Sequence, residues 1–326
     1  MNALEKKFLR EIRKAGLCLE GDRVLVALSG GPDSMAMLAL FSAVQPVLHL
    51  GIAVAHCNFQ LRAAESDADE AFVVSHARAL GLECHVERFD TRQQATLLKR
   101  SIEETARVLR YRYFERLQLE LGYTAVATGH HISDNAETML FNLFRGVSLP
   151  GLKGIRARNG RVIRPMLLIS KRDISGYLKE RAIAFRTDSS NLADDHDRNF
   201  IRNRIIPLIE ERFKGKLMVS LQRLSEQAGE LELFLELYFG RLIEQEPGLS
   251  LREGTLEVDA LRRLSVFEQK EIFKRALMEM GAPVDAQGLQ KLVDLLGTQP
   301  GRVVMAGRQV RVLWKGKKLC FLSGEE

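Results

Sequence analysis

The chain has few cysteines, no motif that pairs them, and no long apolar run. Its four cysteines, Cys18, Cys57, Cys84 and Cys320, are scattered over 326 residues and never form C-x-x-C. That scatter argues against a zinc knuckle or an iron–sulfur site and indicates reduced thiols. No apolar run approaches the roughly 18 residues of a membrane span, and the first residues, MNALEKKFLREIRKAG, lack the apolar region of a signal peptide. We therefore expect a cytoplasmic protein without a membrane partner.

Acidic residues are scarce in two parts of the chain. Residues 151–223 hold 17 Lys and Arg against 8 Asp and Glu, a local balance of +9, so the rest of the chain carries −3 of the net +6. Residues 301–324 hold six basic residues and no acidic one. Such regions suit a polyanion such as RNA or DNA, although a solvated basic face explains the charge alone equally well.

The first 150 residues alternate between short apolar runs and longer segments with helical periodicity. The runs cover 24–28, 48–55, 83–89 and 125–128, and the helical segments cover 34–43, 67–80, 101–121 and 135–145. This alternation predicts an α/β fold, a Rossmann-like parallel sheet with helices on both faces. Ligands on such sheets bind at the carboxyl ends of the strands, where 29–34, 56–62 and 129–137 are expected.

The later residues predict a long helix and a small α+β domain. Leucines and other apolar residues recur in steps of four and three from Leu217 to Leu242, which is one helical stripe, and the EPG at 246–248 ends it. We expect the stripe to pack within the chain rather than in a dimeric coil. Helices near 259–280 and 285–296 and strands near 302–305, 309–313 and 319–322 follow. The predicted domains are a first domain at 1–216, a helical linker at 217–247 and a small C-terminal domain at 248–326.

The segment SGGPDS follows the first predicted strand and begins a helix. Gly30 and Gly31 can expose backbone N–H groups, and the helix N-terminus adds partial positive charge, which is the chemistry of a pyrophosphate cradle. The Walker signature G-x-x-x-x-G-K-[ST] is absent. Asp33 would repel a phosphate, unless Mg²⁺ bridges the two.

Three further segments carry candidate site residues. His56 and Arg62 follow the second strand and can face a phosphate or a base. On the helix at 101–117, Glu103 and Arg107 have the spacing of an ion pair, which leaves Arg110 for a phosphate.

The third segment is TGHHISDNAETMLFNLFRG, in which acidic side chains lie at a strand end and a helix start. His130 and His131 are adjacent, so both do not easily ligate one ion, and a zinc site is disfavoured. Asp134 and Glu137 could be simple helix caps, or could hold Mg²⁺ or a substrate amine whose proton they accept. The residues alone do not decide which of the two binds the amine.

SGGPDS matches the S-G-G-x-D-S signature of the PP-loop ATP pyrophosphatases, a resemblance that implies ATP cleaved between its α- and β-phosphates. SGGPDS is followed, in this order, by AHCNFQLR, ETARVLRYRYF, the TGHH segment, GLKGI, IRPML and RTDSSNLADDHDRNFIRNRIIPLI. Through these segments, residues 20–212 resemble the tRNA(Ile)-lysidine synthetase family. The resemblance implies a ligase that uses ATP and Mg²⁺. ATP adenylates C2 of the wobble cytidine of a tRNA(Ile) with a CAU anticodon, and L-lysine displaces AMP.

The resemblance also implies roles for individual residues. Asp33, Arg110, Asp134 and Glu137 would be catalytic, with Asp33 and Asp134 toward Mg²⁺. ATP would be bound by Ser29, Gly30, Gly31, Pro32, Asp33, Ser34, His56 and Arg62, and tRNA by Arg198, Asn199, Arg202, Asn203, Arg308 and Lys315. Relatives often carry another His or Gly near His56, so the roles of residues 57–60 are unassigned. A homodimer is left open.

Three rival functions remain for comparison. A PP-loop tRNA thiolase would need catalytic cysteines or an iron–sulfur cluster, for which the scattered cysteines offer no pair. A non-catalytic ATP-gated tRNA-binding module would not need Asp33 and Asp134. An amidotransferase-type ligase would need a glutaminase domain, and the sequence shows none.

Overall fold

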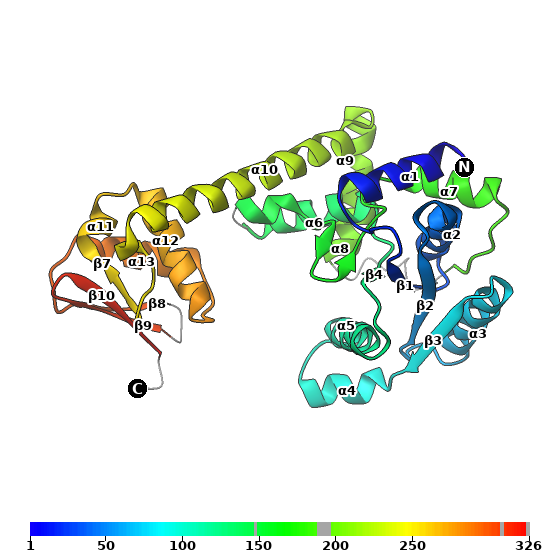
Figure 1. Ribbon diagram of the computed structural model, residues 1–326, viewed down its shortest axis with the longest axis horizontal. Helices are drawn as coiled ribbons and strands as arrows, with labels where there is room; N and C mark the ends of the chain where they lie inside the picture. Colours follow the sequence, from blue (N-terminus) through cyan, green and yellow to red (C-terminus); the bar gives the residue numbers. More distant parts are fainter. Residues whose placement is uncertain (147–148, 188–196, 307–309, 324–326) are drawn as a thin grey trace. The chain divides into compact units, whose positions relative to one another are not determined.

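The computed structural model describes residues 1–146, 149–187, 197–306 and 310–323. Its contacts divide the chain into two compact units, Met1–Gly229 and Glu230–Glu326. The division falls inside the helix α10 (Lys216–Gln245). Figure 1 shows the elements of both units, which are described separately below.

The first unit is built on a six-stranded sheet in the order β3-β2-β1-β4-β6-β5. All pairings are parallel except that of β5 with β6. The strands are β1 (Arg23–Ala27), β2 (Gly51–Asn58), β3 (Glu83–Arg88), β4 (Ala125–Ala127), β5 (Arg158–Asn159) and β6 (Val162–Ile163). The order reverses between β1 and β4, and in open α/β sheets ligands bind at such a switch point, beyond the carboxyl ends of the strands.

Helices and short helical turns connect the strands, and side-chain caps define where several of the helices begin. Asn2, Ser101, His131 and Ser170 each form a capping box with the acidic residue three positions on. The helices are α1 (Ala3–Lys14), α2 (Pro32–Leu48), α3 (Ala64–Ala79), α4 (Thr91–Leu98), α5 (Ile102–Leu121), α6 (Ile132–Phe144), α7 (Lys171–Glu180), α8 (Asp197–Phe200) and α9 (Ile206–Phe213), with a 3₁₀ turn at Leu149–Lys153 and a π-helical turn at Ile201–Ile205.

The two faces of the sheet are covered by different helices. Val24 and Val26 of β1 belong to a core cluster with Phe8 of α1 and Phe41 of α2, whereas Leu25 belongs to a cluster with residues of α5. Alternate residues of a strand point to opposite faces, so β1 is buried on both sides, as strands in parallel sheets are. Figure 1 shows α1, α2 and α7 on one side of these strands and α5 on the other. The predicted parallel α/β fold is confirmed.

The second unit packs helices on an antiparallel sheet in the order β7-β10-β9-β8. Phe239 of α10, Phe273 and Trp314 belong to its buried core. Its elements are β7 (Thr255–Glu257), α11 (Val258–Arg262), α12 (Val266–Glu279), α13 (Ala286–Leu296), β8 (Val303–Ala306), β9 (Val310–Lys315) and β10 (Lys318–Ser323), with a 3₁₀ turn at Pro247–Leu249.

The predicted single helix at 259–280 is wrong. Ser265 accepts a hydrogen bond from the Glu268 backbone and begins a new helix, α12, so that α11 and α12 are separate. The predicted long helix is confirmed as α10. Its stripe packs only at the two ends, since Leu217 and Leu242 lie against buried cores while Leu231 is 39% exposed. Among the described residues, no helix is long and apolar enough to span a membrane.

Candidate active site

The SGGPDS segment forms a tight turn between β1 and α2. Gly31 is the N-cap residue of α2 and Pro32 its first helical residue, a position where the missing N–H of proline costs nothing. Ser29 and Ser34 brace the turn: their hydroxyls lie 3.1 Å apart, the Ser34 hydroxyl donates to the Gly31 carbonyl at 3.0 Å, and it accepts from the Ser29 N–H at 3.2 Å. The turn therefore keeps its shape without a ligand.

Two glycines allow close packing around this turn. Gly30 has φ +86, a conformation that side-chain-bearing residues rarely adopt. Gly129, which follows β4, lies so close to α2 that a Cβ there would be 3.4 Å from the Ser34 nitrogen and from the Asp33 carbonyl carbon. The loops after β1 and β4 therefore meet at the switch point of the sheet.

Asp33 lies at the base of this site with one carboxylate oxygen unsatisfied. About a third of its side chain is exposed (34%), yet Oδ1 is buried and has no hydrogen-bond partner among the described residues. Burial raises the pKa of Asp33, and the neighbouring Asp134 adds to that effect, while His131, Lys171 and Arg202 oppose it. A buried carboxylate without a partner is costly, which is typical of a site built to receive a cation.

His131 holds Asp33 and the start of α6 together. Its Nδ1 accepts a hydrogen bond from the Ser133 N–H at 3.2 Å, and its Nε2 lies 3.7 Å from Asp33 Oδ2. Because Nδ1 accepts, the neutral ring carries its proton on Nε2, toward Asp33. The ring is buried, and Asp134 completes the capping box by accepting from the His131 N–H at 2.8 Å. In the sequence, His131 stands out only as a disfavoured zinc ligand, and its contact with Asp33 is not visible there.

Glu137 and Asp134 meet Arg202 from a segment 65 residues further along the chain. Arg202 forms a two-point ion pair with Glu137, Nε to Oε1 at 2.7 Å and Nη2 to Oε2 at 2.8 Å, and reaches Asp134 Oδ1 at 3.3 Å. The Glu137 side chain is only 7% exposed. The Arg202 guanidinium thus contacts two of the three carboxylates gathered here, those of Asp134 and Glu137, and Asp33 is the third.

The segment that carries Arg202 is a π-helical turn packed on α6. Its Ile201 belongs to an apolar cluster with Ala136 and Leu140 of α6, which fixes the turn against that helix. π-helical turns are rare and frequent at functional sites. Of the other residues predicted to bind tRNA here, Arg198 lies over the Phe141 ring, with 5.2 Å from Cζ to the centroid, and Asn199 and Asn203 both have polar partners.

The two candidates after β2 have different surroundings. His56 is buried, and its Nδ1 donates to the Leu28 carbonyl at 2.8 Å, which leaves Nε2 as an acceptor without a partner among the described residues. Burial lowers the pKa of His56, so the ring is neutral and suited to accept from a base amine rather than to bind a phosphate. Arg62 pairs with Asp69 at 2.8 Å, and Asp69 also pairs with Arg186.

Arg110 and His130 belong to a basic part of the site. Arg110 lies over the Phe59 ring, with 5.2 Å from Cζ to the centroid. Burial lowers the pKa of His130 to about 4, Asp134 opposes this shift, and Arg164, Arg107 and Arg110 add to it. Arg107, which was expected to pair with Glu103, lies over the Tyr111 ring, with 5.2 Å from Cζ to the centroid.

The carboxylates of this site could bind Mg²⁺ only together with the phosphates of a bound substrate. No group of three or more His, Cys, Asp or Glu side chains that could hold a metal ion occurs among the described residues. Mg²⁺ usually keeps several waters and binds through one or two carboxylates plus substrate phosphates. Asp33, with its unsatisfied Oδ1, is the residue that fits this pattern, and Asp134 is the neighbouring carboxylate.

In the second unit, the basic side chains gather at the turn between β9 and β10. Lys315, Lys317 and Lys318 are exposed there. Arg308, also predicted to contact tRNA, lies outside the described residues.

The sequence is similar to a known domain family and to several proteins of one named enzyme family. Residues 2–209 match the family model of the PP-loop domain. The chain is 54% identical to a tRNA(Ile)-lysidine synthase of Chlorobaculum tepidum over 313 residues, 96% of this chain and 95% of that one. A tRNA(Ile)-lysidine synthase of Bacteroides thetaiotaomicron is 44% identical over 264 residues, 79% of this chain and 58% of its own. One from Clostridium perfringens is 32% identical over 299 residues, 90% of this chain and 62% of its own.

The fold and the glycine turn define the class: the first unit is a PP-loop domain. Within that class, the chain belongs to the tRNA(Ile)-lysidine synthase (synthetase) family. The predicted family is thus confirmed and favoured over the thiolases.

A solved structure shows the same fold at much lower identity. The U34-tRNA thiolase NcsA of Methanococcus maripaludis, with its [4Fe-4S] cluster, matches 68% of this chain and 77% of its own, with a TM-score of 0.56 and 18% identity. At that identity the likeness concerns the fold alone. The four cysteines of this chain are all free thiols.

Proposed function

We propose that this protein joins L-lysine to C2 of the wobble cytidine of a tRNA(Ile) with a CAU anticodon, through an adenylated cytidine and with release of pyrophosphate and AMP. The observation that carries the proposal is the convergence of Asp33, Asp134 and Glu137 at the β1/β4 switch point, in a chain of this family. A cytoplasmic location and a homodimer stay predictions.

The glycine turn supplies the part of the site that receives ATP. Backbone N–H groups at the start of α2 are donors for phosphate oxygens, and the helix N-terminus adds positive charge. The hydroxyls of Ser29 and Ser34 become donors to a phosphate when they rotate away from their partners within the turn. Bound Mg²⁺ would neutralise charge on the leaving pyrophosphate. Asp33 would hold that ion with Oδ1, and Arg110 would face the phosphates or the base. His56 accepts a hydrogen bond from the base through Nε2.

Asp134 and Glu137 supply the part that receives lysine. Carboxylates attract an ammonium group, hold it near the adenylated carbon, and accept its proton when the amine attacks. Glu137 is paired with Arg202 here, so a bound lysine replaces Arg202 as the cation at Glu137 or at Asp134 Oδ1. Either exchange keeps the local charge balanced, which a buried carboxylate requires.

The tRNA contacts are proposed from charge and position. Arg198, Asn199, Arg202 and Asn203 lie in α8 and the π-helical turn beside the catalytic carboxylates, and Lys315 lies on the basic turn of the second unit. Arg308 completes the predicted set without a structural description. Side chains of these types bind phosphates and base edges.

Pyrophosphate release tests the first step. The protein is incubated with ATP, Mg²⁺ and unmodified CAU tRNA(Ile), without lysine, and pyrophosphate is measured. We expect release that depends on the tRNA and is lost when the wobble cytidine is replaced by uridine. Release that does not depend on the tRNA would contradict adenylation of the base. A matched control uses Ser133→Ala, because Ser133 engages His131 only through its backbone N–H.

A further inference from the structure

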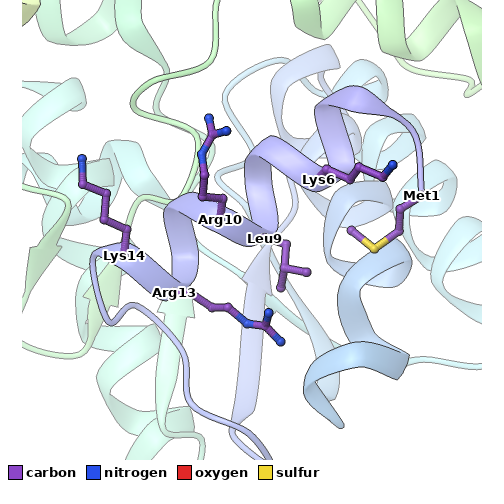
Figure 2. Close-up of a pocket in the computed structure, with 6 residues that line it drawn as sticks. All are labelled: Met1, Lys6, Leu9, Arg10, Arg13 and Lys14. Atoms are coloured by element: carbon purple, nitrogen blue, oxygen red, sulfur yellow. The ribbon is translucent and has the colours of Figure 1, made fainter.

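The exposed side of α1 is a continuous stripe of basic side chains. Lys6, Lys7, Arg10, Arg13 and Lys14 fall within about 120° of the helix circumference at 3.6 residues per turn. We call these five residues the basic stripe. Lys6, Arg10, Arg13 and Lys14 are exposed and, with Met1 and Leu9, line an open hollow of about 560 Å³. Figure 2 shows these side chains extending from successive turns of α1.

Helix stability alone does not explain this stripe. Basic residues in the last turn, such as Arg13 and Lys14, are favoured by the helix dipole. Lys6 and Lys7 lie near the opposite end of the helix, where the same dipole opposes positive charge. The four pairs that Arg10 forms with the other members are like-charged at i,i+3 or i,i+4 spacing, which destabilises a helix.

Acidic neighbours leave most of the stripe uncompensated. Glu11 pairs with Arg10, Nε to Oε1 at 3.2 Å. Glu5 is buried, where it accepts from the Tyr177 hydroxyl at 3.0 Å and from Arg181 at 2.6 Å, so it faces away from the stripe. In the described part of the chain, Lys6, Arg13 and Lys14 have no ion-pair partner. The charge is therefore available to an external polyanion.

The other side of α1 decides against a membrane surface. A helix that binds membranes keeps its apolar side free to enter the lipid. The apolar side of α1 is buried in the core of the first unit. Phe8 and Ile12 are fully buried, and Phe8 packs edge-on against Phe41 with 5.2 Å between ring centroids. The exposed side of α1 carries mostly positive charge at helical spacing, which suits regularly spaced phosphates.

We propose that the basic stripe of α1 binds the phosphodiester backbone of the tRNA substrate. The inference rests on the proposed function, since it takes the partner to be that tRNA. Lys6, Arg10 and Lys14 are separated by four residues each, which is about 6 Å along the helix axis. The stripe thus presents a row of cations along which a phosphate strand lies, and each phosphate contact releases counterions.

The test is the salt dependence of tRNA binding. Affinity for unmodified CAU tRNA(Ile) is measured over a range of KCl concentrations for the wild type and for K6A/R10A/R13A/K14A. An equal loss of charge at exposed positions elsewhere, R78A/R92A/K99A/R100A, is the matched control. A charge-preserving variant, K6R/K14R, and the unfolding midpoint of every variant check that α1 is intact; the alanine variant should unfold at the wild-type temperature or above it.

We expect the slope of log K against log [KCl] to become shallower by about 0.7–0.9 for each lost contact, hence by about 2.8–3.6 in the α1 variant, which loses four cations. The control and K6R/K14R should keep the wild-type slope. An unchanged slope in the α1 variant, or an equal change in the control, would overturn the proposal. If the wild type modifies tRNA but the α1 variant keeps the wild-type slope, the binding of tRNA by the basic stripe is refuted and the proposed function stands. If the wild type does not bind tRNA, the proposed function itself is refuted.

Discussion

Arg202 donates a hydrogen bond to each carboxylate oxygen of Glu137, from Nε at 2.7 Å and from Nη2 at 2.8 Å, although the two residues are 65 positions apart in the chain. This pair joins the π-helical turn to α6, and in the described part of the chain Arg202 is the cation that contacts Glu137. Arg202 thus balances the negative charge of Glu137 in the ligand-free protein.

Replacing Arg202 should therefore destabilise the fold. Arg202→Ala leaves the buried Glu137 carboxylate unpaired, so we expect the free energy of unfolding to fall by about 2 kcal/mol. In a double-mutant cycle with Glu137→Gln, the coupling should be about 1–3 kcal/mol by urea denaturation. Arg198→Ala, which removes a neighbouring arginine that lies over Phe141, is the matched control. Equal losses for both arginines with no coupling would contradict the account.

Asp33 should separate stability from activity. Its Oδ1 is buried without a partner and burial raises its pKa, so Asp33→Asn should stabilise the ligand-free protein by about 1 kcal/mol. The same change should reduce tRNA-dependent pyrophosphate release at least 100-fold, on the order of 3 kcal/mol of barrier. Asp69→Asn, at a carboxylate paired with Arg62 and Arg186, should instead destabilise. If Asp33→Asn instead lowers the free energy of unfolding and leaves pyrophosphate release unchanged, the proposed role of Asp33 is contradicted.

His130 should make the protein less stable in mild acid. Its pKa is about 4 in the fold, below the usual histidine value of about 6.5. A lowered pKa means that the unfolded chain takes up the proton first, so this contribution is full above pH 6.5 and is lost as the pH falls toward 4. The loss amounts to at most about 3 kcal/mol. His130→Gln should flatten stability over that range, whereas His49→Gln, at a ring that is 70% exposed, should not.

The cysteines should be dispensable for the reaction. Burial raises the pKa of Cys18 and of Cys57 to about 12, so neither is a thiolate at neutral pH. A variant with all four cysteines replaced by alanine should keep lysine transfer within a few-fold of the wild type at a temperature where it is folded, as checked by circular dichroism. Loss of transfer in a folded variant would revive the sulfur-transfer alternative.

The sequence predicts the parts of the fold that local pattern encodes. The apolar run before Ser29 and the glycine turn after it identify β1 and the start of α2, because strand burial and the cap are properties of adjacent residues. The break between α11 and α12 escapes a periodicity argument, since apolar spacing continues past the Ser265 cap. The strands β5 and β6 and the helix α8 have two to four residues each, which is too few to show a periodic pattern.

The site shows the same limit. Asp134 and Glu137 stand out because acidic residues at a helix start are locally visible. The pairing of Glu137 with Arg202 depends on how the π-helical turn packs on α6, which no spacing in the chain reveals. His131 is a similar case: its adjacency to His130 is visible, but its contact with Asp33 arises only when the ends of β1 and β4 meet.

The transfer of lysine to tRNA is the central claim. The protein is incubated with ATP, Mg²⁺, radiolabelled L-lysine and unmodified CAU tRNA(Ile), and label in the precipitated tRNA is counted. We expect stable label at one position per tRNA, absent without ATP and lost when the wobble cytidine is changed. Label that persists after that change, or tRNA adenylated without ever accepting lysine, would contradict it.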